Sequence, residues 1–163
     1  MKVLTEEGCA EWLQSNVAAA ELLHVGYPFQ IRFAIPKDTG RKTALARELT
    51  AVMHDRILML WVTEWSVFPS CENLDLFYGY RRFLGEARTL TEAPGHVFEK
   101  HERTQAFSLF SLALYFFWDA SLINDQGSWV SVDHDEFLTL RSTTDVGLRH
   151  LLDGIDRFNL RAI

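Results

Sequence analysis

The chain has 163 residues, of which 48% are hydrophobic, 23% are charged and 13% are aromatic. This length and composition are typical of one globular domain, covering residues 1–163, and they exclude a disordered chain or a small scaffold that needs disulfides. The net charge of −6 and the pI near 5.5 disfavour nucleic-acid binding, which requires clustered lysines and arginines.

The start of the chain and its apolar segments predict a cytoplasmic protein that does not enter a membrane. The N-terminus lacks the apolar core of a signal peptide and becomes acidic at Glu6 and Glu7. The most apolar segment, Ala106–Trp118, has only about thirteen residues, whereas a membrane span needs about twenty. Cys9 and Cys71 lie far apart without metal-ligand spacing, which is typical of free thiols in a reducing compartment.

Hydrophobic periodicity predicts a helix, a strand and a second helix in the first third of the chain. Apolar residues recur at helical spacing over Thr5–His24. Apolar and other residues then alternate over Phe29–Ile35, which predicts a half-buried strand. The helical pattern returns after Gly40 and ends near His54.

The segment Ile57–Phe68 is the expected centre of the sheet. Its first half, Ile57–Val62, is apolar on both faces, as in a strand that is covered on both sides. A strand, a helix and this strand follow one another, so we expect a crossover in which Phe29–Ile35 and Ile57–Phe68 run parallel. A helix over Cys71–Leu84 should follow.

The second half of the chain predicts a long loop, a helix, a hairpin and a last helix. The loop has about fifteen residues and passes through Pro94–Gly95; long loops are often binding loops or lids. Further elements are expected at Glu102–Trp118 (helix), Ala120–Ile123 with Ser128–Val132 (hairpin), and Asp145–Arg157 (helix). The predicted fold class is therefore α+β: a mixed sheet of about four strands, built from a βαβ unit and a C-terminal hairpin and packed with about five helices.

The exit of the central strand is where the sequence suggests a binding site. Glu64 continues an apolar row of this strand, and a carboxylate there is costly unless it is paired or lies at the mouth of a pocket. Arg81 and Arg82 on the following helix are candidate partners, and so is Arg32 if its strand lies alongside. Two interpretations stay open: a salt bridge at the strand end, and a carboxylate that binds a ligand.

If this carboxylate binds a ligand, we expect a pocket with aromatic walls at the strand exit. The two helix arginines would supply its positive charge, and the loop Ala87–Glu99 would be its lid. The candidate binding residues are therefore Glu64, Trp65, Tyr78, Arg81, Arg82 and His96.

Two polar segments each have a structural and a functional interpretation. Ile35–Thr43 lies between a strand and a helix and contains Gly, Lys and Thr, but it lacks the first glycine of a phosphate-binding loop. An exposed turn before a capped helix explains it better than a nucleotide site. Asp133–Glu136 contains four groups that could bind a metal or transfer protons, but it also resembles a capping box or a solvated turn.

Two histidines and a cysteine complete the candidates. Glu99 and Glu102 favour a helix N-terminus, and we expect His96 and His101 beside them to lie in solvent. The alternative is that the segment from Glu99 is a loop, in which the two histidines could converge on a metal. Cys71 falls near the first position of a helix, where the helix dipole favours a thiolate, although an inert thiol also explains it.

No motif in the chain names a reaction, a cofactor or a metal. The preferred hypothesis is a non-catalytic protein-interaction or regulatory module, such as an adaptor or an immunity-like protein, whose partner is another protein. The alternative is a small-molecule-binding protein or enzyme with a pocket around Glu64, Arg81 and Trp65. The sequence leaves open whether the chain is an enzyme and which oligomeric state it adopts.

Overall fold

A seven-stranded antiparallel sheet forms the centre of the computed structural model, which describes residues 1–16, 27–54, 57–65 and 71–163. The strand order is β1-β4-β3-β5-β6-β7-β2. The strands are β1 (Lys2–Leu4), β2 (Phe29–Ala34), β3 (Leu58–Glu64), β4 (Gly95–Phe98), β5 (Asp119–Asn124), β6 (Ser128–Val132) and β7 (Phe137–Ser142). The described helices are α1 (Glu6–Asn16), α3 (Thr39–Met53), α4 (Cys71–Phe83), α5 (Arg103–Tyr115) and α6 (Asp145–Ile155), with short 3-10 turns at η1 (Lys100–Glu102) and η2 (Asp156–Phe158).

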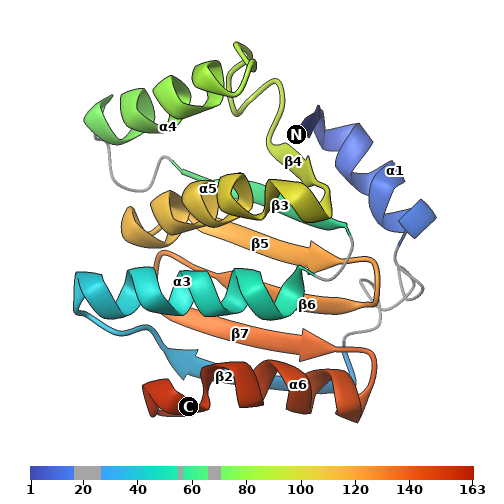
Figure 1. Cartoon of the computed structure of the whole chain (residues 1–163), viewed down its shortest axis with the longest axis vertical. Helices are drawn as coiled ribbons and strands as arrows, with labels where there is room; N and C mark the ends of the chain where they lie inside the picture. Colours follow the sequence, from blue (N-terminus) through green and yellow to red (C-terminus); the bar gives the residue numbers. More distant parts are fainter. Residues whose placement is uncertain (17–26, 55–56, 66–70) are drawn as a thin grey trace.

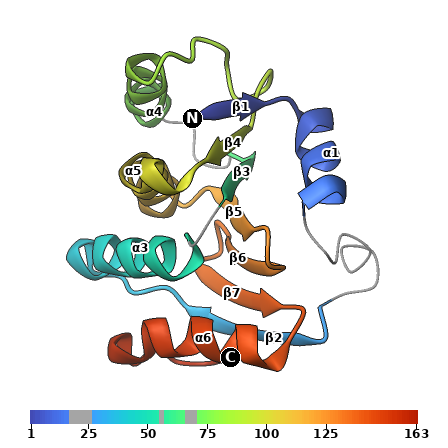
Figure 2. The ribbon, with the colours of Figure 1, turned by 45° about the vertical axis from the view of Figure 1, so that its right-hand side comes forward.

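The two faces of the sheet are covered unequally. Helices α3, α5 and α6 lie on one face, and α1 lies on the other (Figures 1 and 2). Alternate side chains of β3 point to opposite faces of the sheet. Leu58, Leu60 and Val62 belong to the main core, whereas Met59 and Trp61 pack in the smaller cluster with α1. Because both faces of β3 are covered, its sequence is a continuous apolar run, as predicted.

The α+β class is confirmed, but the predicted number of strands is too low. The strands β1, β4 and β7 were not predicted. β1 and β4 have three and four residues, which is too short for an alternating pattern to be recognised. β7 follows the polar segment 133–136, whose resemblance to a helix start obscured the alternation of Leu138 and Leu140 with their neighbours. The other predicted elements agree with the structure to within a few residues.

The sheet is antiparallel rather than mixed. β2 and β3 run in the same direction, as expected, but β5, β6 and β7 lie between them, so the two do not pair. Short turns join β5 to β6 and β6 to β7, and β7 then pairs with β2 through Phe29–Ala34. Consecutive strands that are joined by short turns pair most readily. The meander of β5, β6 and β7 therefore lies between β3 and β2, which the βαβ prediction had placed side by side.

Some predicted features lie at the edge of the described residues. α1 is described as far as Asn16, so the predicted continuation to residue 24 lies outside the described residues, as do residues 66–68 of the predicted central strand. α4 ends at Phe83, within one residue of the predicted Leu84, and Gly85 follows it with a φ of +90°. No helix in the described part of the chain is long and apolar enough to cross a membrane.

β4 places a histidine in the core, where the sequence predicted a solvent-exposed loop. His96 is fully buried, and it lies opposite Val3 of β1 and Leu60 of β3. The edge of its ring meets Phe77 at 5.9 Å between centroids. Burial, and then the charge of Arg81, lower the pKa of His96 from 6.5 to about 3. His96 is therefore a neutral core residue, and the segment that was predicted to be a lid includes an interior strand.

The buried histidine predicts a pH dependence of stability. The pKa of His96 is lower in the folded chain, so acid protonates the unfolded chain first, and the free energy of unfolding falls as the pH decreases from 6.5 towards 3. The contribution of this one group approaches about 1.4 kcal/mol per pH unit. We expect His96→Leu to flatten the pH dependence measured by urea unfolding, and the exposed His101→Gln to leave it unchanged. Equal slopes in all three proteins would contradict the assignment.

Candidate functional site

The structure does not gather the residues predicted around Glu64 into one cavity. Glu64 is half-buried at the end of β3, opposite Asp119, with a bulge in the ladder after Val62. Trp65 packs against the main core, and Arg82 is exposed on α4. Arg32 lies on the edge strand β2 and pairs with Asp133 at 2.8 Å, so its strand does not lie alongside β3 as one interpretation required.

Arg81, Tyr78 and His96 do come together, but in the core. Arg81 is fully buried and donates from Nη2 to the carbonyl of Ala93 at 2.9 Å, while its guanidinium carbon lies 5.8 Å from the ring centre of Tyr78. The Tyr78 hydroxyl accepts the Leu90 amide at 3.1 Å. These contacts hold the segment between α4 and β4 against the helix. Arg81 therefore has a structural role in place of the predicted role in a pocket.

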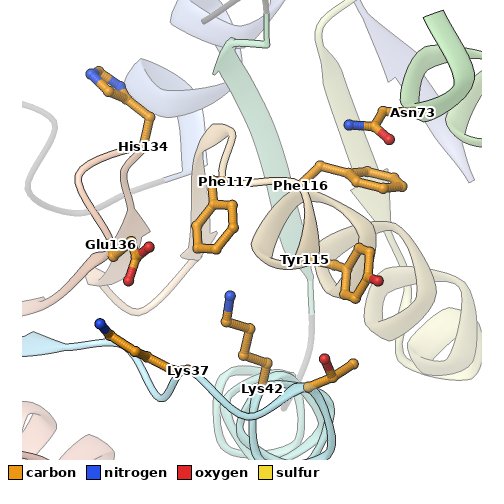
Figure 3. A pocket seen from close by; sticks show the side chains of 9 residues that line it. Lys37, Lys42, Asn73, Tyr115, Phe116, Phe117, His134 and Glu136 are labelled. Atoms are coloured by element: carbon orange, nitrogen blue, oxygen red, sulfur yellow. The ribbon is translucent and has the colours of Figure 1, made fainter. Parts of the chain in front are cut away.

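A cavity of about 650 Å³ lies instead where β2, β3 and β6 end and β5 and β7 begin. The start of α3, the end of α5, and the turn between β6 and β7 surround it (Figure 3). It combines residues from 35–43 and 133–136, the two polar segments that each had a structural explanation in the sequence. The lining residues are Lys37, Thr39, Lys42, Asn73, Tyr115, Phe116, Phe117, His134 and Glu136.

Lys42 is the most unusual residue of this cavity. Its side chain is only 6% exposed, and Nζ lies 3.6 Å from the centre of the Phe117 ring (Figure 3). Among the residues that the structure describes, Nζ has no hydrogen-bond acceptor and no ion-pair partner. Burial lowers the pKa of Lys42, and the carboxylate of Glu136 opposes this shift. The stem of Lys42 is therefore buried, and its amine lines the cavity without a protein acceptor among the described residues.

The backbone is strained at two residues that line the cavity. Phe117 and Glu136 have φ values of 57° and 66°, in the left-handed region that non-glycine side chains rarely adopt. At Glu136 the turn is held by hydrogen bonds from the Glu136 amide to the Asp133 carbonyl and from the Asp133 amide to the Phe137 carbonyl. Such strain costs about 1 kcal/mol or more per residue and clusters at functional sites.

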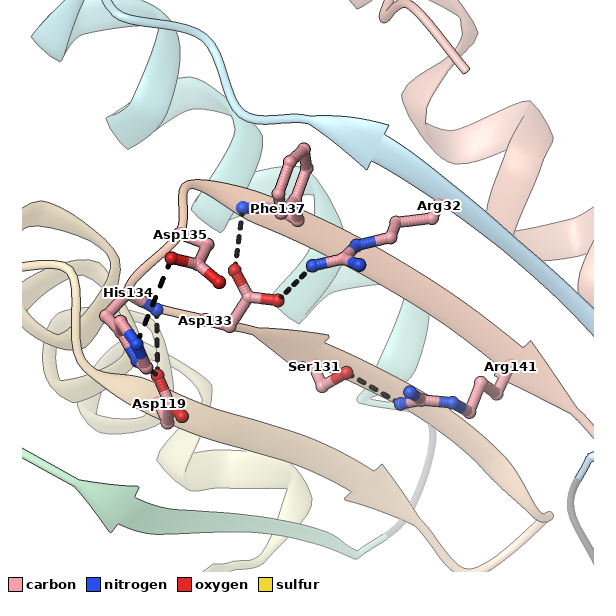
Figure 4. Close-up of polar contacts among 8 residues, drawn as sticks. All are labelled: Arg32, Asp119, Ser131, Asp133, His134, Asp135, Phe137 and Arg141. Atoms are coloured by element: carbon pink, nitrogen blue, oxygen red, sulfur yellow. Dashed lines mark hydrogen bonds and ion pairs between the residues drawn. The ribbon is translucent and has the colours of Figure 1, made fainter. Parts of the chain in front are cut away.

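The segment 133–136 forms the turn of the β6–β7 hairpin. Asp133 accepts the Phe137 amide at 2.9 Å through Oδ1 and pairs with Arg32 through Oδ2 (Figure 4). The predicted capping box is therefore wrong, and the alternative of a turn is confirmed. Three or more His, Cys, Asp or Glu side chains that could together hold a metal ion do not occur in the described ranges.

Asp119, at the start of β5, holds His134 at the rim of the cavity, with the imidazole ring directed away from Lys42 and Phe117 (Figure 3). Its Oδ1 accepts the backbone amide of His134 and lies within 2.8 Å of the ring Nδ1 (Figure 4). This hydrogen bond raises the pKa of His134 above 6.5, and the negative charges of Asp119, Asp135 and Asp133 contribute. His134 therefore becomes cationic at a higher pH than an ordinary histidine.

Other predicted features have a structural role or lie outside the description. Glu99 and Glu102 lie at a helix start, as predicted, and form a capping box at η1 in which Glu102 accepts the Glu99 amide at 3.0 Å. His101 is exposed as predicted, and its Nδ1 is 3.6 Å from Glu99. Cys71 begins α4 as predicted, but its side chain lies outside the described part of the structure, so its reactivity stays a prediction.

The cavity combines a positive side with an aromatic side. Lys37 and Lys42 extend from the segment before α3 and from its first turn towards Phe117 and Glu136 (Figure 3). No model of a known protein family matches the chain, and no match was found among curated proteins or solved structures. Chemically, the arrangement can hold an anion beside an apolar group.

Sequence reasoning missed Lys42, although a signal was present. Leu45, Ala46 and Leu49 follow Lys42 at spacings of three, four and seven residues, and all three are fully buried. Residues at these spacings share one face of a helix, so the pattern places Lys42 on the buried stripe of α3. Lysine is almost never fully buried unless its charge is paired, so this position could have marked Lys42 as unusual.

The contact between Asp119 and His134 predicts a measurable titration. We expect Asp119→Asn to lower the pKa of His134 towards 6.5, because the carboxylate that stabilises the imidazolium is removed. The pKa can be followed from the ring protons by NMR. Asp135→Asn is the matched control: its Oδ1 lies 4.0 Å from His134 Nε2, and its effect should be smaller. A pKa that is unchanged in Asp119→Asn would contradict the assignment.

Proposed function

We propose that the protein binds a small organic anion in the cavity beside α3. The ligand would carry a carboxylate or phosphate group on an apolar, preferably planar, body. The observation that carries this proposal is Lys42, whose stem is buried and whose amine faces the cavity without a hydrogen-bond acceptor among the described residues.

The charges around the cavity favour an anion. Two lining lysines, Lys37 and Lys42, face one lining carboxylate, Glu136, while the charge of a protonated His134 is balanced by Asp119. The chain as a whole has a net charge of −6. A small anion would therefore be attracted to this end of an otherwise acidic molecule.

The size and walls of the cavity suit the apolar part of such a ligand. Its volume of about 650 Å³ lies within the range of roughly 300–1,000 Å³ that is typical of small-molecule sites. Tyr115, Phe116 and Phe117 provide aromatic surface on one side (Figure 3). Aromatic walls with a few polar groups are the usual composition of an organic-ligand site.

The contacts of Lys42 leave its amine available to a ligand. The aliphatic stem is buried, while Nζ lies against the Phe117 ring in a cation–π contact and lines the cavity. An anion in the cavity would add the charged acceptor that the described residues do not supply.

The substitution Lys42→Met tests this role directly. Methionine preserves the apolar stem and removes the charge, so we expect unchanged or higher thermal stability together with roughly 10- to 100-fold weaker anion binding. The probes are phenyl phosphate and benzoate, compared with neutral benzamide, and binding is measured by NMR shifts of the cavity residues and by melting temperature. Lys100→Met, an exposed lysine outside the cavity, is the matched control.

Two results would overturn the proposal. One is the absence of shifts at His134 and Phe117 with either anionic probe in the unaltered protein. The other is a large loss of stability in Lys42→Met together with full retention of anion binding, which would make Lys42 a purely structural residue.

A further inference from the structure

Helix α4 exposes an apolar stripe to solvent. Leu76 is 55% exposed and Phe83 is 82% exposed, and the ring of Tyr80 stacks on Phe83 with centroids 6.2 Å apart. Spacings of four and seven residues place these three side chains on one side of the helix. The opposite side, with Phe77 and Arg81, is fully buried. α4 is thus apolar towards the core and also on part of its solvent face.

A glycine lies in the middle of this exposed stripe. Gly79 is exposed, and a Cβ atom built on it would meet no other atom within 4 Å. Nothing within the described chain therefore requires a glycine here, although glycine weakens a helix interior relative to alanine. A glycine does allow the backbone of another chain to approach closely.

Two oppositely charged residues lie beside the stripe. Asp75 and Arg82 are exposed, and they lie seven residues apart along the same side of α4. If two copies of α4 lie antiparallel, the acidic end of one stripe faces the basic end of the other. The stripe is thus complementary in charge to itself, which is the requirement for a two-fold interface.

We propose that α4 packs antiparallel against α4 of a second copy of this chain, around a two-fold axis near Gly79. Leu76 of each copy then contacts Phe83 of the other, and Asp75 pairs with Arg82 across the interface. The glycines face each other at the crossing point, where a side chain would hold the helices apart.

The proposed dimer does not depend on the anion site. A single helix pair buries less surface than a standard protein interface, so the dimer should be weak and dependent on concentration. It provides a specific surface for the protein-interaction hypothesis that the sequence suggested, with the chain itself as the partner.

A charge swap tests the orientation of the two helices. Sedimentation velocity from low micromolar to millimolar concentration should show a monomer–dimer equilibrium in the unaltered full-length chain. We expect Asp75→Arg and Arg82→Asp to weaken the dimer by roughly two- to fivefold each, and the double variant to recover the original dissociation constant, because the pair is restored in reverse.

Substitutions at the crossing point and in the stripe test the contact itself. Gly79→Ala should raise the melting temperature of the monomer, because alanine favours helix, yet weaken the dimer. Phe83→Glu should abolish dimerisation. The matched control is Val146→Glu, which changes another exposed apolar residue, 76% exposed on α6, and should leave the equilibrium unchanged.

Three experimental results would contradict the proposed dimer. A chain that stays monomeric over the whole concentration range has no such interface. A dimer that is insensitive to Phe83→Glu uses another surface, and a dimer that the double charge variant does not restore uses α4 in another orientation. Circular dichroism confirms that each variant is folded, so loss of the dimer cannot be attributed to unfolding.

Discussion

The antiparallel pairing of β3 with β5 is the contact on which the rest of the structure depends. β3 is buried on both faces, and the register places its last residue, Glu64, opposite Asp119 at the start of β5. Because β6 and β7 follow through short turns, this register extends to the turn that carries His134 and Glu136. Asp119 then holds His134 by two contacts. One hydrogen-bonded frame thus connects the centre of the core to the rim of the cavity.

Several departures of this chain from the ordinary rules of stability lie at its candidate surfaces. Phe117 and Glu136 adopt left-handed backbone conformations at the cavity, and Lys42 places an amine there without an acceptor among the described residues. Gly79 lies within α4 beside its exposed apolar stripe. Such local conflicts are expected at functional surfaces. Others lie elsewhere: Asn159 is left-handed at the end of η2, and the Nε and Nη1 atoms of Arg81 are buried in the core without a partner in the described part of the chain.

The sequence indicated the segments that form the candidate site, but it did not indicate that they come together. The sequence singled out residues 35–43 and 133–136, but each had an adequate local explanation, and no local pattern showed that they meet. The pocket predicted around Glu64 assumed that Arg81 and His96 would be accessible, whereas both are fully buried, Arg81 on α4 and His96 on β4. Burial of Lys42 was recoverable from helical spacing, because Leu45 and Leu49 lie on the same stripe of α3.

The sequence by itself determined the α+β class, the buried centre at β3, and most helix and strand bounds, because periodicity and capping are local properties. The bounds of α4, predicted as Cys71–Leu84 and observed as Cys71–Phe83, are an example. Only the tertiary structure decided which strands pair. The short strand β4 has no pattern of its own, and it exists because β1 and β3 on either side satisfy its backbone. The cavity depends on the same non-local pairing, which brings the first turn of α3 to the β6–β7 turn.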